Sequence, residues 1–210
     1  MQRLGKAFDF QPPKKEGVHA VGAIQAMANG KGKVFMGMGG NFALAAPDTE
    51  KVFDGLKQCS LTLHVSTKLN RSHLIHGKTA LILPCLGRTE EDISSHGPQF
   101  VSTEDTAGRV RMSHGDLPPT SPELKSEVAI VCDMARAVLG KNNTTDWEGM
   151  KENYELIRDK IEEVIPGFDA YNERVKKAGG FYLPNGARER DFNTADKKAR
   201  LTINPLNKAR

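Results

Sequence analysis

Two polar segments of this sequence contain residues that could bind a nucleotide. Gly37, Gly39, Gly40 and Asn41 come at the end of the short apolar run Val34–Met38. Glycines lack a Cβ, so backbone N–H groups can approach a phosphate or a base closely, and an Asn side chain offers a nucleobase edge both a donor and an acceptor. We interpret this loop as a binding site for the nucleotide end of a cofactor. A tight turn after a strand explains the glycines equally well on pattern alone.

The second segment follows the apolar run Leu61–Val65 and contains Ser66, Thr67 and Asn70 together with two cations. Hydroxyls, an amide and positive charges suit a ribose and its phosphates. A solvated loop is the commoner explanation of such a segment taken alone. Ligands of open α/β sheets bind at the carboxyl ends of the strands, and we expect both loops to lie at that common edge.

The elements that would position these loops are predicted from apolar periodicity. The predicted strands are Lys33–Met38, Leu61–Val65 and Thr79–Leu83. The predicted helices are Val18–Ala28, Thr49–Cys59 with Asp48 as N-cap, Glu123–Leu139, Asp146–Val164 and Phe168–Lys177. Strands that alternate with helices and loops in this order favour an α/β fold with a parallel sheet.

The remaining segments of the chain are of a different kind. Gln99–Glu104 and Arg109–Ser113 flank a turn and predict a hairpin. Gly179–Arg190 has the composition of an exposed linker, and Lys198–Ile203 has that of a strand without a partner. We therefore expect an α/β domain over residues 1–145, a helical connection over 146–185, and a linker with a first strand of a further domain over 186–210.

Composition restricts the class of protein. The 210 residues are 38% hydrophobic and 27% charged with a net charge of +4, and the charges are interspersed. This is typical of a globular protein and argues against a dedicated nucleic-acid binder. No apolar run approaches the roughly 20 residues that span a bilayer, and the first residues lack the apolar core of a secretory signal. Cys59, Cys85 and Cys132 are few and far apart. We expect a cytoplasmic protein with no membrane or nucleic-acid partner.

Other candidate chemistry has simpler explanations. The histidines form no H-E-x-x-H motif, and His73 and His76 lack a clear third ligand, so we expect no metal site. Cys85 could be a nucleophile, but a buried thiol is the commoner case. The adjacent carboxylates Glu104 and Asp105 could act as a base, although turn capping is the commoner role.

Several collinear stretches resemble one protein family. They are KVFMGMGGNFALAAPDTE (33–50), LTLHVSTKLNRSHL (61–74), TALILPCLGRTEED (79–92), STEDTAGRVRMSHGDLPP (102–119), SEVAIVCDMARAVLG (126–140) and GGFYLPNGARERDFNTADKKA (179–199). They are similar to molybdopterin-dependent oxidoreductases of the formate dehydrogenase and dimethyl sulfoxide reductase type, and most similar to the formate-dehydrogenase-like branch. The resemblance covers nearly the whole chain.

The resemblance implies a large catalytic subunit with a bis(molybdopterin guanine dinucleotide) molybdenum centre. This chain would be its Rossmann-like third domain, with a helical extension toward a β-barrel. Carried over by position, the residues lining the dinucleotide site would be Gly37, Gly39, Gly40, Asn41, Ser66, Thr67 and Asn70. Nothing in the sequence matches the segment with the molybdenum ligand or an iron–sulfur cysteine cluster.

The resemblance also implies that the partners are the remaining domains of the parent enzyme and, in the full-length protein, a small-molecule substrate. We expect the isolated chain to bind no cofactor and to catalyse no turnover. Two alternatives remain open. One is a free-standing nucleotide-binding α/β module that acts through a partner protein. The weaker one is a small α/β hydrolase using Ser or Cys85, for which the G-x-S-x-G motif is absent.

Overall fold

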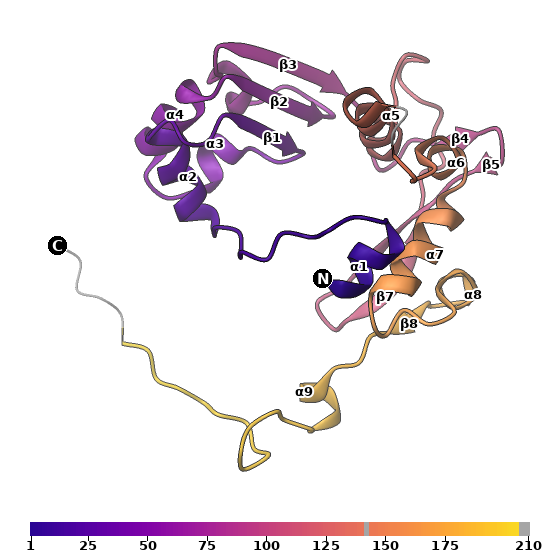
Figure 1. The fold of residues 1–210 in the computed structure, drawn as a ribbon. Helices are drawn as coiled ribbons and strands as arrows, with labels where there is room; N and C mark the ends of the chain where they lie inside the picture. The colour runs from indigo at the N-terminus through magenta and orange to yellow at the C-terminus, as the bar shows by residue number, and fades with distance from the viewer. Residues whose placement is uncertain (141–142, 206–210) are drawn as a thin grey trace.

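A three-stranded parallel sheet lies at the centre of the N-terminal half of the chain in the computed structural model, which describes residues 1–140 and 143–205 (Figure 1). Its strands are β1 (Val34–Met38), β2 (Leu61–Ser66) and β3 (Thr79–Pro84), in the order β1-β2-β3. Both pairings are parallel. The predicted α/β fold, Rossmann-like with helices flanking a parallel sheet, is confirmed.

One face of the sheet is covered by helices that the sequence predicted. They are α2 (Ala20–Ala28) and α4 (Thr49–Gln58), accompanied by the short helix α3 (Phe42–Ala45) and a 3₁₀ turn, η1 (Arg71–Leu74). Asp48 caps α4 as predicted, because its carboxylate accepts the N–H of Lys51 at 3.3 Å. The apolar stripes of α2 and α4 bury Ile24 and Leu56 against the sheet.

The other face of the sheet is covered only in part, by α5 (Glu127–Leu139). Ile130 of α5 packs against Leu63 and Val65 of β2. The helix begins at Glu127 and not at the predicted Glu123, because Lys125 is still extended: its C=O accepts the N–H of Leu86 at 3.0 Å. Ser126 then supplies the N-cap by accepting the N–H of Ala129 at 3.1 Å.

A second region follows β3 and contains short antiparallel strands. Strands β4 (Ile93–Ser94) and β5 (Gly97–Pro98) pair with each other, while β6 (Val101–Glu104), β7 (Arg109–Ser113) and β8 (Phe181–Tyr182) form a sheet in that order. The predicted hairpin, β6–β7, is confirmed. The expectation that Gly179–Arg190 is only an exposed linker is wrong, because Phe181 pairs with Val110 and is 8% exposed.

The remaining helices surround this second region. They are α1 (Gln2–Ala7), α6 (Trp147–Glu152), α7 (Tyr154–Val164), α8 (Tyr171–Lys176) and α9 (Gly186–Glu189). The single helix predicted over Asp146–Val164 is therefore divided in two. Asn153 is extended (φ −138°), and its side chain accepts the N–H of Glu155 at 3.0 Å to start α7. None of the described helices is long and apolar enough to cross a bilayer.

The predicted strand Lys198–Ile203 does not form. Its backbone has no strand partner among the described residues, and Leu201 and Ile203 are each 95% exposed. Isolated extended chain leaves its N–H and C=O groups to water, so an apolar run alone does not make a strand. Residues 206–210 of the predicted segment 186–210 lie outside the described part of the chain.

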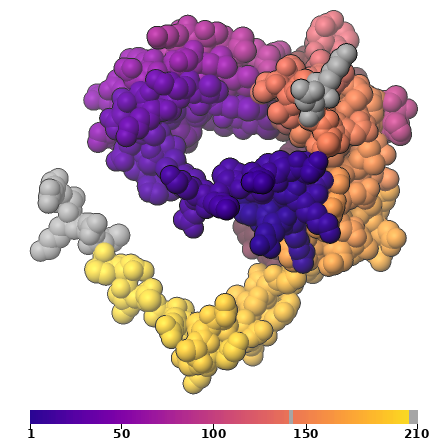
Figure 2. All heavy atoms as spheres, viewed as in Figure 1, coloured from indigo at the N-terminus to yellow at the C-terminus, as the bar shows by residue number. Residues whose placement is uncertain are grey.

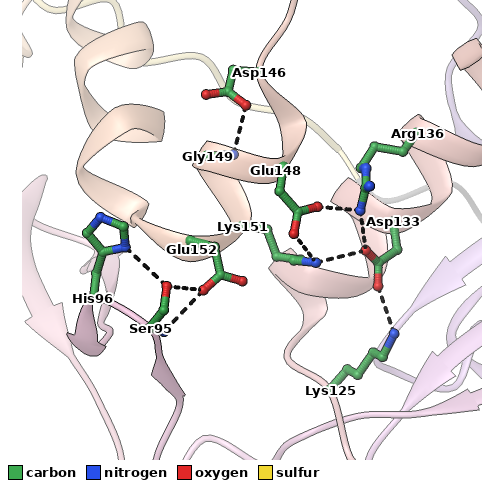
Figure 3. Close-up of polar contacts among 10 residues, drawn as sticks. All are labelled: Ser95, His96, Lys125, Asp133, Arg136, Asp146, Glu148, Gly149, Lys151 and Glu152. Carbon is green, nitrogen blue, oxygen red and sulfur yellow. Dashed lines mark hydrogen bonds and ion pairs between the residues drawn. The ribbon is translucent and has the colours of Figure 1, made fainter. Parts of the chain in front are cut away.

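Ion pairs join α5 to α6 (Figure 3). Asp133 accepts the amines of Lys125 at 2.7 Å and of Lys151 at 3.4 Å. Glu148 pairs with Lys151 at 2.9 Å and also with Arg136. The network links α6 to α5, the helix that packs on the parallel sheet.

A separate contact attaches the β4–β5 turn to the end of α6. The carboxylate of Glu152 accepts the N–H of Ser95 at 3.1 Å and its hydroxyl at 2.6 Å (Figure 3). At the other end of the chain, α1 lies across α7, where the amine of Lys160 donates to the C=O of Ala7 at 3.3 Å. Figure 2 shows an opening between the parallel-sheet region, the indigo α1 and the orange helices.

Candidate cofactor-binding site

The two predicted loops leave the same edge of the sheet. Met38 at the end of β1 is in register with Val65 of β2, and the N–H of Gly39 donates to the C=O of Val65 at 2.8 Å. Residues 39–41 and 66–70 therefore start side by side at the carboxyl ends of neighbouring parallel strands. The expectation that both loops lie at a common edge is confirmed, and this edge is where open α/β sheets bind ligands.

Hydrogen bonds tie these loops to each other. The side-chain amide of Asn70 donates to the C=O of Gly40 at 2.9 Å. The hydroxyl of Ser72 donates to Oδ1 of Asn41 at 2.9 Å, and the same hydroxyl accepts the N–H of Ala43 at 2.9 Å. Asn41 and Asn70 thus use polar atoms to hold the loops together, which positions the backbone around them.

Gly39 and Gly40 leave the edge open. Both adopt positive φ angles, +67° and +66°, and a Cβ at either position would meet no atom within 4 Å. Their backbone is accessible to a bound group, as a nucleotide-binding loop requires. Gly37 differs, since it lies within β1 and a Cβ there would come within 3.2 Å of Nδ1 of His64. Close packing in the sheet explains that glycine.

Of the two hydroxyl residues that follow the predicted strand Leu61–Val65, Thr67 is the one that lines a cavity. Ser66 donates its hydroxyl to the C=O of Lys68 at 2.8 Å, whereas Thr67 is exposed and lines a cavity of about 260 Å³ below the carboxyl end of β2. Most of the polar side chains around this cavity come from the second region. They are Arg88, Glu90, Asp92, Gln99, Ser113, His114, Ser126, Glu127 and Tyr154.

The carboxylate of Glu90 forms hydrogen bonds that join two segments of the cavity wall. Its carboxylate accepts the N–H of Gly87 at 2.5 Å, and the N–H and hydroxyl of Thr120 at 2.6 Å each. These bonds, from Thr120 first and then Gly87, lower the pKa of Glu90. Arg88 donates to the hydroxyl of Ser113 at 3.0 Å, and its side chain is exposed beside the cavity.

Tyr154 joins three segments on the opposite wall of the cavity. Its hydroxyl donates to the carboxylate of Asp92 and lies 2.6 Å from the hydroxyl of Ser126, the N-cap of α5. Its backbone N–H donates to Oε1 of Gln99 at 3.0 Å. Tyr154 is 3% exposed, and burial raises the pKa of its phenol, so the group is neutral.

An apolar cavity of about 500 Å³ lies on the other side of the α5 N-terminus, where Glu127 and Val128 line both cavities. Met38, the last residue of β1, borders this second cavity, whose other walls come from α1, α5, α6 and α7. The end of β2 therefore faces a cavity with mixed polar and apolar walls, and the end of β1 faces an apolar one.

The alternative chemistries find little support in the described residues. No three His, Cys, Asp or Glu side chains there come together as metal ligands. His64 and His73 pack edge to face at 4.8 Å, and burial, then His73, lowers the pKa of His64. Cys85 is 3% exposed, and burial raises the pKa of its thiol, which opposes thiolate formation.

Asp105 has the predicted capping role. Its carboxylate accepts the N–H groups of Ala107 and Arg109, each at 3.0 Å, and so closes the turn between β6 and β7. The bond from Arg109 contributes most to lowering the pKa of Asp105. The carboxylate is committed to the turn, so a role as a general base is not supported.

Sequence reasoning missed the cavity residues contributed by the second region. Asp92, Ser126 and Tyr154 lie far apart in the sequence and meet only through tertiary structure. In the sequence, Tyr154 fits the apolar stripe of the predicted helix Asp146–Val164. Nothing near it in the sequence indicates which residue its hydroxyl would bond to. The one available signal was Asn153, a strong N-cap residue in front of it.

Comparison with known proteins shows close similarity to parts of longer chains. Rv2900c of Mycobacterium tuberculosis, named an uncharacterized oxidoreductase, is 48% identical over 204 residues, or 97% of this chain and 26% of that protein. Protein YdeP of Escherichia coli is 43% identical over 199 residues, again 26% of its length. No model of a known protein family matches the chain. The chain thus spans about a quarter of the curated relatives it matches, and some of those relatives are named oxidoreductases.

Proposed function

We propose that this chain is part of a molybdopterin-dependent oxidoreductase of the formate-dehydrogenase-like branch, and that it contributes one wall of a bis(molybdopterin guanine dinucleotide) site. The observation that carries the proposal is the shared edge of β1 and β2, where the loops of Gly40 and Thr67 lie side by side. The similarity to longer proteins named oxidoreductases supports the redox class.

The residues present fit a dinucleotide at this edge. The space at Gly39 and Gly40 is open, so a planar base or a phosphate can approach the backbone there. Thr67 offers a hydroxyl beside the cavity of about 260 Å³. Asn70 acts indirectly, by holding the C=O of Gly40 in place. We assign Gly39, Gly40 and Thr67 to direct contact, and Asn41 and Asn70 to positioning of the loops.

The molybdenum cofactor, when bound, supplies the redox chemistry, and the protein supplies position and a fixed polar environment. The described residues of this chain would bind and orient the dinucleotide. The metal ligand, the substrate-binding residues and the remaining walls would come from other parts of the parent protein. We accordingly expect no turnover by these 210 residues alone.

The test is a pair of glycine substitutions in the full-length polypeptide. Gly39→Leu places a side chain in the proposed dinucleotide site, so molybdenum content should fall by about tenfold, equivalent to about 1.4 kcal/mol of binding. Gly30→Leu is the control. Gly30 has nearly the same φ, +66°, and the same open space within 4 Å, but it follows α2, far from the strand exits.

Both substitutions carry the same cost of a side chain at positive φ, so a general folding defect would affect both proteins. Equal molybdenum content in the two variants would contradict the proposed site. Binding of guanine nucleotides by the isolated chain, with no molybdenum in the full-length protein, would favour the alternative of a nucleotide-binding module.

A further inference from the structure

The outer edge of β1 is open and lacks the features that protect natural sheet edges. The N–H of Gly39 points toward β2, so alternation along the strand directs the N–H and C=O groups of Val34, Met36 and Met38 outward. Within residues 1–140 and 143–205 these outward groups have no partner. The strand sequence, VFMGM, contains no charge and no proline that would block pairing.

The opposite edge of the sheet, β3, is built differently. The N–H of Cys85 donates to Ser66 of β2 at 3.2 Å, so Pro84 lies at an outward position, where its missing N–H costs nothing. The next outward group, the N–H of Leu86, donates to the C=O of Lys125 at 3.0 Å. The outward groups of Ala80 and Ile82 also lack a partner among the described residues, but β3 ends at a proline and a bonded N–H, whereas β1 ends with its outward groups unpaired.

The side chains of β1 are also partly bare on one face. Val34, Met36 and Met38 share that face with Leu63 and Val65 of β2. Beneath α5, Leu63 and Val65 are 5% and 0% exposed, whereas Val34 is 63% and Met36 and Met38 are each 42% exposed. Met38 continues into the apolar cavity of about 500 Å³, so the bare face and the cavity form one apolar surface.

We propose that β1 is an interior strand of the intact protein, and that a further parallel β-strand from the rest of the same polypeptide pairs with its open edge. The chain spans 26% of the length of Rv2900c and of YdeP, so each of these longer proteins has ample additional chain to provide such a strand. Doubly wound sheets continue beyond their first strand in the reverse order, and their ligand crevice lies at that switch point.

One additional strand, together with its crossover helix, would both pair with the open edge of β1 and cover the exposed face of the strand. The helix α4, which connects β1 to β2, lies on the face of Phe35. Crossovers of the second half of a doubly wound sheet run in the opposite direction with the same hand, so their helices cover the opposite face. That is the face on which Val34 and Met36 are exposed.

A second copy of the chain fits less well. Two identical edges related by a two-fold axis pair as antiparallel strands, and such a pairing would supply no helix for the bare face. The inference does not depend on the cofactor, because it concerns only how the sheet is completed. It predicts that the switch point of the completed sheet lies beside the loop of Gly39 and Gly40.

Hydrogen exchange of the wild-type full-length polypeptide, prepared without cofactor, tests the proposal. The amides of Met36 and Met38 point outward, whereas the amide of Gly39 bonds to β2. If β1 is interior, the outward amides should exchange at least about a hundredfold more slowly than free peptide, and the hydrogen-bonded amide of Gly39 is expected to be protected in the same way. Their protection should not change on dilution.

Three results would overturn the proposal. The first is rapid exchange at Met36 and Met38 while the amide of Gly39 stays protected. The second is protection that disappears on dilution, which would indicate pairing between copies. The third is a mature polypeptide in cells that consists of these 210 residues only. Loss of molybdenum from the protein would leave all three measurements unaffected, so failure of the proposed function can be distinguished.

Matched proline variants provide a second measurement. Met36→Pro and Ile82→Pro each remove an outward N–H from residues that are 42% exposed, one on β1 and one on β3. In the full-length protein, Met36→Pro should lower the melting temperature clearly more than Ile82→Pro. Equal effects would contradict an interior position for β1.

Discussion

The parallel-sheet region (residues 18–84) and the second region (residues 85–190, α5 included) each have an apolar core, but among the described residues only the second region encloses a buried guanidinium. In the first, Ile24, Val52 and Leu56 form an apolar core between helices and sheet. In the second, buried polar side chains act as junctions: Arg158 is 5% exposed, donates to Asn172 at 2.6 Å and to the C=O of Phe100 at 3.0 Å, and lies over the Phe100 ring.

This comparison indicates that the apolar core positions the strands, whereas the polar contacts position the side chains at the site. An apolar core has no directional requirements and holds the strand exits rigidly, as a ligand-binding edge needs. The polar junctions are directional, and those of Glu90 and Tyr154 lie at the wall of the cavity that Thr67 lines. Substitutions should therefore act globally in the first region and locally in the second.

The largest effect is expected in the apolar core. Leu56→Ala removes a fully buried side chain from the contact between α2, α4 and the sheet. The free energy of unfolding should fall by about 2–5 kcal/mol, measured by denaturant titration. Leu74→Ala is the control, because Leu74 is 77% exposed and should change stability little. Similar losses in both variants would mean that this core does not dominate the region.

A smaller and more local effect is expected at Tyr154. Tyr154→Phe leaves the carboxylate of Asp92 and the hydroxyl of Ser126 without their shared partner. A loss of about 1–3 kcal/mol is expected, with faster amide exchange confined to residues near the start of α5 and around β4. Tyr182→Phe, at a residue that is 48% exposed, should have no such effect. Uniformly faster exchange would contradict a local role.

The smallest effect is expected in the ion network of Figure 3. Asp133→Asn should cost at most ~1 kcal/mol near neutral pH, because Lys125, one of its partners, is 60% exposed. The hydrogen bond from Lys125 is the main cause that lowers the pKa of Asp133 below its ordinary value of 3.8.

The sign of the pH dependence follows from that lowered pKa. The stabilisation by Asp133 is complete above pH 3.8 and is lost as pH falls through the lower pKa of the folded state. The difference in unfolding free energy between wild type and Asp133→Asn should therefore shrink in acid. Asp191→Asn is the control: the carboxylate of Asp191 is 78% exposed, so this substitution should change the unfolding free energy little. A constant difference across this range would rule out the ionic contribution.

Much of the parallel-sheet region could be predicted from local sequence. β1, β2, β3, α2 and α4 all lie where apolar periodicity and the cap residue Asp48 placed them. The common edge of the two loops followed from strand order. Local pattern is sufficient here because each element buries an apolar stripe of its own, and parallel connections between strands leave few possible arrangements.

The second region depended on contacts that no local pattern contains. The break at Asn153, the late start of α5 and the pairing of β8 each result from partners many residues away. The predicted terminal strand failed for the same reason, since a strand needs a neighbour as well as a suitable sequence.

The sequence by itself determined the α/β fold, the glycine-bearing and hydroxyl-bearing loops, and the resemblance on which the cofactor proposal depends. Only the tertiary structure decided that Gly37 serves packing, that Asn41 and Asn70 join the loops, and that Tyr154 and Asp92 complete the cavity beside Thr67. The physical reason is the distance along the sequence over which each kind of interaction acts. Hydrophobic periodicity is fixed by neighbours along the chain, whereas the geometry of hydrogen bonds is fixed by segments that only the folded chain brings together.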